Sequence, residues 1–463
     1  MVANLISTIG DYLWTYLVIG LLLGCAVYFT VRTHGVQFRM IPEMCRIMLG
    51  RDRKDADKKG IGSFQAFAVA LASRVGTGNL AGVASAIFIG GPGAVFWMWI
   101  TALFGAATAF MEATLAQLYK KKGKESFYGG PAYYMTTGLG ARWMAIFFAV
   151  MVLLNFGMAN QTVQSNTIVA SLSSLFGVNP LWVALPIALL AFLIISGGVV
   201  RISQVTSFLV PIMAIGYILV ALFVLLTNLG AIPQMLGLIF KGAFGFRQAA
   251  GGMFGAAIMQ GVKRGLFSNE AGEGSAPNAA AIAETTHPVK QGLIQALGVF
   301  VDTILICTCT AFIILLSGLW NSGADGIMLT TIAIESEVGL FGKYFISAAV
   351  FLFAFTTIIS NYYYAETNLR YLTRRKWIVW VFRCLTLCVV FLGALIELQT
   401  AWAMVDLTMA LMTFCNLVAV ALLSNQAFIL LKDYRSQKKA GKMEPEFDKS
   451  LLPDIASKLE GWD

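Results

Sequence analysis

The sequence predicts an all-α protein that crosses a membrane many times. Of its 463 residues, 58% are hydrophobic and 12% are charged, and the mean hydropathy is +0.75. Soluble domains carry about 25% charged residues, so most of this surface does not face water. The apolar residues occur in runs of about 20, the length a helix needs to cross a bilayer. A matched pair of polar interruptions in two of these runs points further, to a transporter.

Eleven segments of the chain have the length and apolar composition of membrane-spanning helices. The run "YLWTYLVIGLLLGCAVYFTV" at residues 12–31 is the first of them. We expect a single transmembrane domain over residues 1–431 and a polar cytoplasmic tail, either regulatory or merely solubilising, over 432–463. The expected spans are 12–31, 66–90, 94–119, 142–174, 181–200, 205–228, 250–272, 290–318, 344–366, 377–396 and 402–431.

The basic residues predict how these spans are oriented. If the N-terminus is outside, nearly all loop lysines and arginines fall on the inner side, whereas the outer loops hold only Lys241, Arg247 and Lys343. Such a bias marks cytoplasmic loops. We therefore expect a multi-pass protein of a bacterial-type cell membrane, with the N-terminus outside and the C-terminus in the cytoplasm. Because the positive charge follows the loops, the expected partner is the lipid bilayer and not a nucleic acid. No feature of the sequence sets the oligomeric state.

Two spans are interrupted by glycine and polar residues at corresponding places. The interruptions are "SRVGTGN" at 73–79 and "GVKRGLFSNEAGEGSAPN" at 261–278. Each lies in the first span of a five-span half, over 66–228 and 250–431, after the extra helix 12–31. The two halves have opposite topology, because one starts inside and the other outside. Broken helices at matching positions of inverted halves are typical of a secondary transporter's binding site.

The first interruption suits an amino acid and a sodium ion. An unwound turn in a membrane helix frees backbone N–H and C=O groups, which must then face protein, water or ligand. The amides of Gly76, Thr77 and Gly78 begin the outer half-helix, and this position attracts a carboxylate. Freed carbonyls suit sodium, and the side-chain oxygen of Asn79 would add a further ligand.

Other classes of protein fit poorly. The string "GTGNLA" has the form GxGxxA, but a dinucleotide site needs a preceding strand, and no P-loop sequence occurs. Seven cysteines and two histidines show no metal-ligand spacing. We expect no cofactor, with sodium as the coupling ion only. The chain lacks a recognisable catalytic constellation, so an enzyme is not expected, and two unlike breaks argue against a channel filter.

Polar residues in two further spans leave alternatives open. Gln164 and Asn166, in "NFGMANQTVQSNTIVA" (155–170), either bind the substrate or hydrogen-bond between helices. Thr356 and Thr357 either ligate sodium or bond back to carbonyls of their own helix. Three ionisable residues inside spans are either functional or structurally paired: Glu112, Asp302 and Arg383.

Several motifs resemble the alanine/glycine:cation symporter family, also called sodium:alanine symporters. They are "GTGNLAGVA" (76–84), "GGPGAVFWMWITALFGAATAFMEATLAQLY" (90–119), "FSNEAGEGSAPNAAA" (267–281) and "FAFTT" (353–357). The resemblance covers essentially the whole chain apart from the tail. It implies eleven helices of the leucine-transporter type, with a five-helix inverted repeat after one extra helix. It also implies sodium-driven import of alanine or glycine by alternating access.

The same resemblance implies roles for individual residues. By similarity to the first core helix of the bacterial leucine transporter, the amides of Thr77 and Gly78 would hold the substrate carboxylate. The pocket residues implied are Gln164, Phe267 and Ser268. The sodium ligands implied are the backbone of Ala72 and Val75 and the side chains of Thr356 and Thr357.

Two positions depart from the usual pattern of that family. Arg74 stands where many members have a small residue, and Asn361 stands where many have tryptophan. If both face one pocket, the substrate would be a different, more polar or acidic amino acid. Arg74 has three open roles: pairing with an acidic substrate, replacing a second sodium, or a structural tie to Asp302, Glu270 or Glu273.

Overall fold

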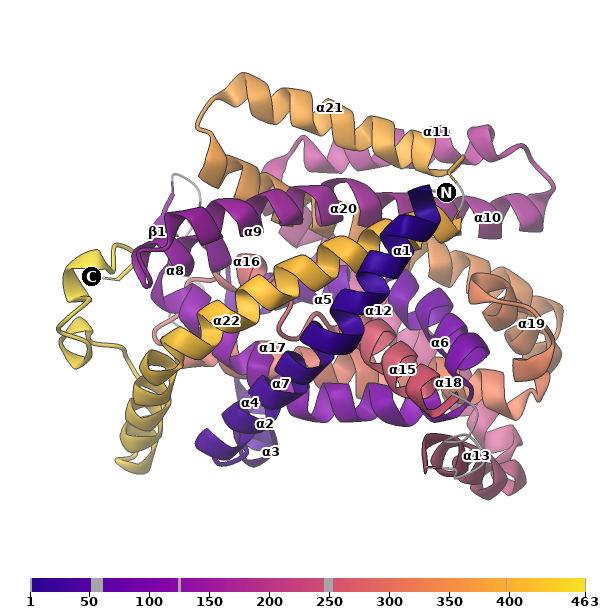
Figure 1. The fold of residues 1–463 in the computed structure, drawn as a ribbon, viewed down its shortest axis with the longest axis horizontal. Coiled ribbons are helices and arrows are strands. Elements are labelled where there is room, and N and C mark those ends of the chain that lie inside the picture. The colour runs from indigo at the N-terminus through magenta and orange to yellow at the C-terminus, as the bar shows by residue number, and fades with distance from the viewer. Residues whose placement is uncertain (1, 51–60, 124–125, 245–252, 397, 463) are drawn as a thin grey trace.

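The chain folds into a bundle of long helices, as its apolar runs predict (Figure 1). The computed structural model describes residues 2–50, 61–123, 126–244, 253–396 and 398–462. Eight helical stretches among them are long and apolar enough to cross a membrane. They are Leu5–Arg32, Gly93–Leu118, Arg142–Phe176, Gly198–Thr227, Pro288–Leu316, Leu340–Leu372, Lys376–Gly393 and Leu398–Lys439.

The other three expected spans are shorter or divided. The expected span 181–200 is a 16-residue apolar helix, α11 (Pro180–Ile195). The first interruption separates α5 (Ser63–Arg74) from the helix Gly78–Gly90. The second ends α15 (Met253–Asn269), and the first three residues expected in that span, 250–252, lie outside the described residues. Both polar interruptions therefore end a helix, as the sequence predicts.

The described residues also contain a pair of short strands and several short turns of π- and 3-10 helix. The strands β1 (Lys121–Lys122) and β2 (Phe127–Tyr128) form one antiparallel pair. The π-helical turns are η1 (Trp14–Val18), η2 (Gly78–Gly82), η3 (Asn155–Ala159) and η5 (Phe300–Cys307), and the 3-10 turns are η4 (Leu229–Ala231), η6 (Leu319–Asn321), η7 (Lys449–Leu451) and η8 (Ala456–Lys458). The remaining helices are α1 (Val2–Leu13), α2 (Ile19–Arg32), α3 (Val36–Arg39), α4 (Ile41–Leu49), α6 (Val83–Gly90), α7 (Gly93–Leu118), α8 (Pro131–Thr137), α9 (Arg142–Leu154), α10 (Asn160–Phe176), α12 (Gly198–Thr227), α13 (Ile232–Phe244), α16 (Ala276–Ala280), α17 (Pro288–Val299), α18 (Thr308–Leu316), α19 (Gly326–Val338), α20 (Leu340–Leu372), α21 (Lys376–Gly393) and α22 (Leu398–Lys439).

The two broken helices lie in the middle of the bundle. The helix α5 packs against α12, α16, α17 and α20, while η2 and α6 pack against α15 and α19. The side chains and backbone around both breaks are accordingly buried. Because these turns are buried, their freed backbone groups must be satisfied by protein or ligand.

Small residues allow α7 to pack closely between α15 and α17. A Cβ at Gly261 of α15 would lie 2.6 Å from the carbonyl oxygen of Ala94, and one at Gly292 of α17 would overlap Thr114. Such close approach increases van der Waals contact between helices in a membrane. The helix α7 thereby fixes the position of the second broken helix relative to the helix that follows it.

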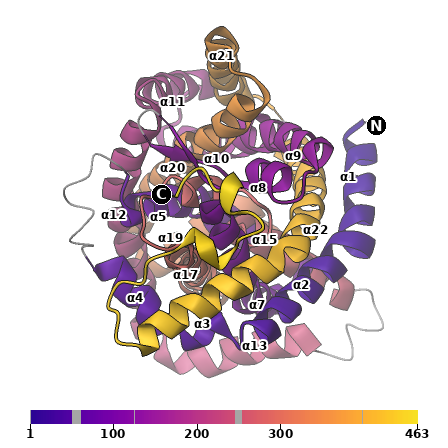
Figure 2. The ribbon, with the colours of Figure 1, turned by 90° about the vertical axis from the view of Figure 1, so that its left-hand side faces the viewer.

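The C-terminal tail is folded against the bundle instead of extending into solvent. Figure 2 shows it lying across the end of the bundle nearest the viewer, which we call the C-terminal face. The Phe447 amide donates to the Thr286 carbonyl over 2.9 Å, and the Trp462 indole N–H donates to the carbonyls of Gln117 and Leu118 over 3.1 Å each. The tail therefore ties the end of α7 to the start of α17, a structural role that its polar composition did not reveal.

Candidate functional site

The first break is held open by side chains that satisfy its amides. After α5 ends at Arg74, the Gly76 amide donates to Asn79 Oδ1 over 2.9 Å. The Thr77 amide donates to Gln164 Oε1, on α10, over 3.1 Å. Both are among the amides expected to bind a carboxylate, and each bonds to a side-chain oxygen. The break therefore presents backbone donors to oxygen acceptors, which is the chemistry that a carboxylate needs.

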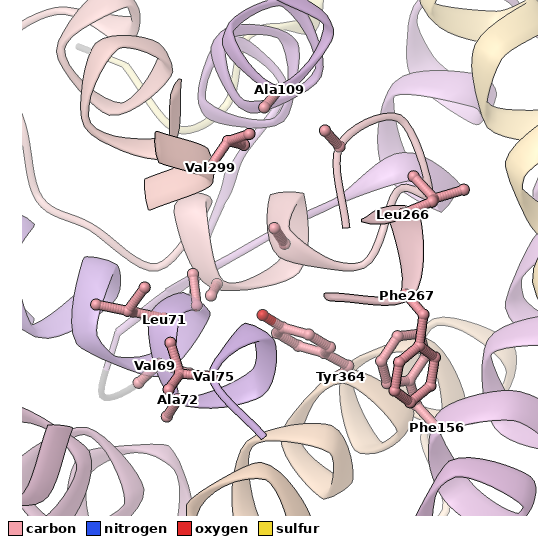
Figure 3. Packing of buried hydrophobic residues seen from close by; sticks show 14 of the residues in the cluster. Val69, Leu71, Ala72, Val75, Ala109, Phe156, Leu266, Phe267, Val299 and Tyr364 are labelled. Carbon is pink, nitrogen blue, oxygen red and sulfur yellow. The ribbon is translucent and has the colours of Figure 1, made fainter. Parts of the chain in front are cut away.

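Glycines of the first break lie in close contact with α15 and α20. A Cβ at Gly78 would lie 2.9 Å from the Phe267 ring and 3.3 Å from the Cα of Ser268, both on the last turn of α15. A Cβ at Gly76 would overlap Oγ1 of Thr357 on α20. Both glycines are needed because the backbone approaches these neighbours more closely than any side chain would allow. Figure 3 shows Phe267 and, across from it, the turn that carries Ala72 and Val75, with the Tyr364 ring between them.

The second break is stabilised by buried carboxylates. Glu270 has a left-handed backbone (φ 57°), and its carboxylate accepts hydrogen bonds from Ser73 over 2.5 Å and from Ser275 over 2.7 Å. Glu112 accepts a bond from the Gly272 amide over 3.2 Å and one from the Asn416 side chain over 2.8 Å. The sequence analysis missed the bond between Ser73 and Glu270. Its only signal was that Ser73 is a polar residue inside the first interruption.

One cluster of oxygen atoms lies between α5 and α20. The Thr357 hydroxyl contacts the carbonyl oxygens of Ala72 and Phe353, each over 2.9 Å. The neighbouring Thr356 hydroxyl bonds back to Leu352 and Phe353 and also contacts Met213 of α12. Of the expected sodium ligands, Ala72 and Thr357 are thus in direct contact. Val75 lies buried on the next turn of the same segment.

A second cluster surrounds Asp302 of η5. Its carboxylate accepts hydrogen bonds from Asn79 over 2.7 Å, from Ser268 over 2.7 Å and from Thr303 over 2.8 Å. The side-chain nitrogen of Asn79 therefore faces Asp302, whereas its oxygen, the atom expected to bind sodium, bonds to the Gly76 amide. The sequence signal for this site was a lone carboxylate in an apolar run, which marks a functional candidate in a membrane. Its partners come from both breaks.

Arg74, the last residue of α5, makes its hydrogen bond to α17. Its side chain is 1% exposed, and Nη1 donates to the carbonyl oxygen of Gln295 on α17 over 3.1 Å. The closeness of the guanidinium to Gly298 leaves no room for a Cβ there. Among the described residues, it forms no direct ion pair with any of the three expected carboxylates. It interacts electrostatically over a longer range with Glu112, Glu270 and Asp302.

The remaining expected substrate residues divide between two places. Gln164 lies at the first break, and the side-chain oxygen of Asn361 lies 2.7 Å from the Ser73 hydroxyl. Asn166 instead donates to the carbonyl of Ile396 over 2.9 Å, at the half-exposed contact between α10 and the end of α21. The structure thus favours interhelical bonding for Asn166. Arg74 and Asn361 have different neighbours, so the contacts do not support one pocket shared by both.

Comparison with known proteins decides between the classes that this geometry allows. A model of the family described as "Sodium:alanine symporter family" matches residues 1–449. The chain belongs to the sodium:alanine symporter family. It is a multi-pass membrane protein and a sodium-coupled amino-acid symporter, not an enzyme.

Curated relatives match the symporter over nearly its whole length. The "Probable sodium/glutamine symporter GlnT" of Bacillus subtilis (strain 168) is 49% identical over 460 residues, covering 99% of this chain and 96% of the relative. The "Amino-acid carrier protein AlsT" of the same organism is 48% identical, with 99% and 97% covered. The "Sodium/proton-dependent alanine carrier protein" of Bacillus sp. (strain PS3) is 39% identical, with 85% and 92% covered.

A solved transporter shows the same fold. The crystal structure of MhsT in complex with L-phenylalanine superposes with a TM-score of 0.55 at 13% sequence identity, covering 86% of this chain and 92% of that one. The symporter therefore has the leucine-transporter-type fold that the family resemblance implied. The identity is too low to transfer binding residues, so these rest on the contacts described above.

The symporter is hollowed at its C-terminal face. A cavity of about 1150 Å³ lies between α8, the start of α12 and the last turns of α20, and its lining includes Tyr133, Tyr363, Glu366 and Arg370. Tyr363 is two residues beyond Asn361 on α20. Arg383, expected to be functional or paired, lies near this cavity, with its guanidinium 3.6 Å from Glu366 and 3.2 Å from the Tyr362 hydroxyl.

The docked tail makes the C-terminal face sensitive to acid. His287 caps α17, because its Nδ1 accepts from the Val289 amide over 3.2 Å, while Nε2 contacts Asp433 over 3.2 Å. Burial lowers the pKa of His287 below its ordinary value of 6.5, although Asp433 acts in the opposite direction. A lowered histidine pKa means that the unfolded chain binds the proton more tightly than the folded one. The contribution of neutral His287 to the free energy of unfolding is therefore complete above pH 6.5, and it falls as the solution is acidified.

We expect the thermal unfolding temperature to fall between about pH 6.5 and pH 5 more steeply in the wild type than in His287→Asn. Asparagine keeps an acceptor for the cap but does not titrate. Unfolding curves of both proteins in detergent, recorded across this range, measure the difference. If the unfolding temperatures of the two proteins fell equally with pH, His287 would be excluded as the titrating group.

Proposed function

We propose that the symporter imports a small neutral amino acid of the alanine or glycine type together with sodium, at the point where its two breaks meet. The close approach of Gly76 and Gly78 to Thr357 and Phe267 carries this proposal. A site in which neither glycine has room for a methyl group is narrow, so it favours a substrate with a small side chain.

The backbone of the first break would hold the substrate carboxylate. The amides of Gly76, Thr77 and Gly78 are consecutive in the chain, and the first two bond to side-chain oxygens of Asn79 and Gln164. A carboxylate is a stronger acceptor than an amide oxygen because it carries charge. Its arrival would release Gln164, whose side chain is then free to bond to the substrate, with Phe267 and Ser268 closing the other side.

Two oxygen clusters would hold sodium. Ala72, Val75, Thr356 and Thr357 supply carbonyl and hydroxyl oxygens without a charge. The cluster of Asn79, Ser268, Thr303 and Asp302 adds a buried carboxylate, which offsets the charge of the cation. Unwound carbonyls and helix ends commonly coordinate coupling ions in such transporters. Because Asn79 also bonds to the Gly76 amide, it connects ion binding to the shape of the substrate site.

Removal of the Thr357 hydroxyl is expected to weaken sodium activation. In Thr357→Ala, we expect the sodium concentration for half-maximal uptake to rise about ten-fold, the effect of losing one contact to a charged group. Thr357→Ser keeps the hydroxyl and should behave as the wild type. Sodium titrations of uptake in proteoliposomes provide the measurement, and unchanged activation in Thr357→Ala would exclude this cluster.

The orientation belongs to the same proposal. We place the N-terminus outside a bacterial-type inner membrane and the C-terminal face, with its cavity, in the cytoplasm, because the basic loops lie on that side. A membrane-impermeant thiol reagent applied to intact cells tests it. A cysteine at Ser322, between α18 and α19, should react, whereas one at Lys442, in the tail, should not.

Flux across sealed membranes tests the function directly. Purified symporter in proteoliposomes should accumulate labelled alanine or glycine under an inward sodium gradient, and an equal potassium gradient should give no accumulation. If neither amino acid accumulates or competes with uptake, the small-substrate proposal is wrong.

A second candidate is an amino acid with an amide side chain. The fully buried Nδ2 of Asn361 has no hydrogen-bond partner among the described residues. An unpaired buried donor is costly, and a polar substrate would satisfy it. The relative at 49% identity is named a probable sodium/glutamine symporter. Glutamine uptake that is lost in Asn361→Ala, while alanine uptake persists, would support this candidate.

A further inference from the structure

Four charged side chains form a network that the proposed sites do not use. It lies near the end of the bundle at which α1, α15 and α22 begin, which we call the N-terminal face. Lys263 of α15 lies 2.5 Å from Asp11 of α1 and 3.6 Å from Asp406 of α22. Arg264 makes two bonds of 3.1 and 3.2 Å to Asp406. The side chains of Lys263 and Arg264 are only 2% and 7% exposed. Buried charges of this kind persist only when they are paired.

The extra first helix makes two of these contacts. Asp11 binds Lys263, and one turn further on the indole N–H of Trp14 donates to the backbone carbonyl of Asp406 over 2.9 Å. Trp14 is fully buried, and Lys263 lies 5.9 Å from its ring centre. The first helix precedes both five-helix halves, but through these contacts it joins α15 of the second half to α22.

The network continues inward as far as the first break. The Arg264 guanidinium stacks over the Trp402 ring at 4.1 Å. The Trp402 ring in turn meets Phe267 edge to face, with 4.7 Å between centres. Phe267 lies against Gly78. A continuous column of side chains therefore fills the path from the N-terminal face to the candidate substrate site, whereas the cavity lies on the opposite face.

A separation of α15 from α22 at the N-terminal face would break this column of contacts. The charge pairs resist that movement, because a buried lysine or arginine that loses its partner carries a large desolvation cost. Asp11 differs from the other three charges, since its side chain is 53% exposed. Water can solvate Asp11 after Lys263 leaves it, so the contact with the first helix is the one that can open and close.

We propose that the first helix is a latch on the extracellular path, acting through Asp11 and Trp14, and that Lys263 and Asp406 are the positioning residues that it holds. This inference rests on the proposed function for its transport readout. Weakening the latch shifts the population toward the state open to the outside. That state binds external sodium, so the apparent sodium affinity should rise while turnover falls.

Kinetics separate a latch from a merely structural contact. In Asp11→Asn, we expect half-maximal sodium activation at a concentration on the order of five-fold lower, together with a lower maximal rate. Trp14→Phe, which keeps the ring but removes the donor, should act in the same direction. Asp11→Glu, which keeps the carboxylate, should have the sodium activation and maximal rate of the wild type. Tyr16→Leu is the matched control, since Tyr16 lies on the same helix and is 71% exposed.

Hydrogen–deuterium exchange without any substrate provides the second measurement and does not depend on transport. In Asp11→Asn, the amides of residues 255–266 and 398–408 should exchange faster, while those of α9 and α21 stay unchanged. If no amino acid is transported but this local change appears, the proposed function fails and the latch remains. An unchanged sodium requirement together with unchanged exchange would overturn the latch, as would faster exchange throughout the bundle.

Discussion

Gly76→Ala is expected to reduce sodium-driven uptake by about 100-fold. The added methyl group would overlap the Thr357 hydroxyl and approach Gln164 Oε1 to 3.1 Å. Both neighbours belong to the candidate substrate and sodium sites, so the substitution displaces the two together. A shift of this size at the binding groups is enough to disrupt coupling even when the helices remain in place. Initial uptake rates in proteoliposomes, normalised to the amount of inserted protein, measure the loss.

The matched control is Gly82→Ala, four residues beyond Gly78 in the same broken segment. There the nearest atom, the Thr77 carbonyl oxygen, would lie 3.9 Å from the new Cβ, an ordinary contact. We expect this variant to transport within about two-fold of the wild type. Equal rates in the two variants would show that the close approach at Gly76 has no part in transport.

Arg74→Met is expected to destabilise the folded symporter by about 3 kcal/mol or more. The guanidinium is the buried cation that acts on three buried carboxylates, those of Glu112, Glu270 and Asp302. Methionine fills much of the same volume but leaves these groups without that positive charge. Thermal unfolding in detergent, with no substrate or sodium present, measures the effect.

The same measurement separates the three roles considered for Arg74. Arg74→Lys retains the charge and should lose much less stability, and Arg142→Met, at an exposed position, should lose almost none. If Arg74 binds an acidic substrate, Arg74→Met would keep the unfolding temperature of the wild type and lose only the binding of that substrate. If Arg74 replaces a second sodium, added sodium should restore stability selectively in Arg74→Met, because a ligand stabilises the state that it binds.

The breaks could be predicted because glycine and polar residues are unexpected inside an apolar run. Arg74 and Asn269 end their helices within the two polar segments singled out, whereas the leucine-transporter-type fold was implied by the family motifs. Those features are local: they depend on the residues themselves and on their order in the chain.

Which side chains meet across helices could not be predicted in the same way. Gln164 and Asn166 are two residues apart, and successive residues of a helix are rotated by about 100°, so they face nearly opposite sides. The polar segment around them marks both equally. Only the positions of the break after α5 and of the end of α21 show that Gln164 reaches the Thr77 amide and Asn166 the Ile396 carbonyl.

The long-range partners of the buried charges were the least predictable part. Asp302 was recognisable as an unusual carboxylate, yet its contacts with Asn79 and Ser268 join residues 223 and 34 positions apart. Three roles were open for Arg74, and none of them included the hydrogen bond that it makes to a backbone carbonyl. Such choices depend on how tightly neighbouring helices approach, and that is set by small residues spread over the whole chain.

The position of Asp11 also bears on how the chain is made. Helices enter the membrane in the order of their synthesis, and an isolated lysine or arginine at the centre of a helix costs about 2.5–3.5 kcal/mol to insert. When α15 is made with Lys263 and Arg264, Asp406 lies 142 residues further along the chain than Arg264, which takes about 7–28 seconds to synthesise at about 5–20 residues per second. Asp11 is already in place. The first helix therefore offers the cationic segment a counter-ion during biogenesis, before its permanent partner has left the ribosome.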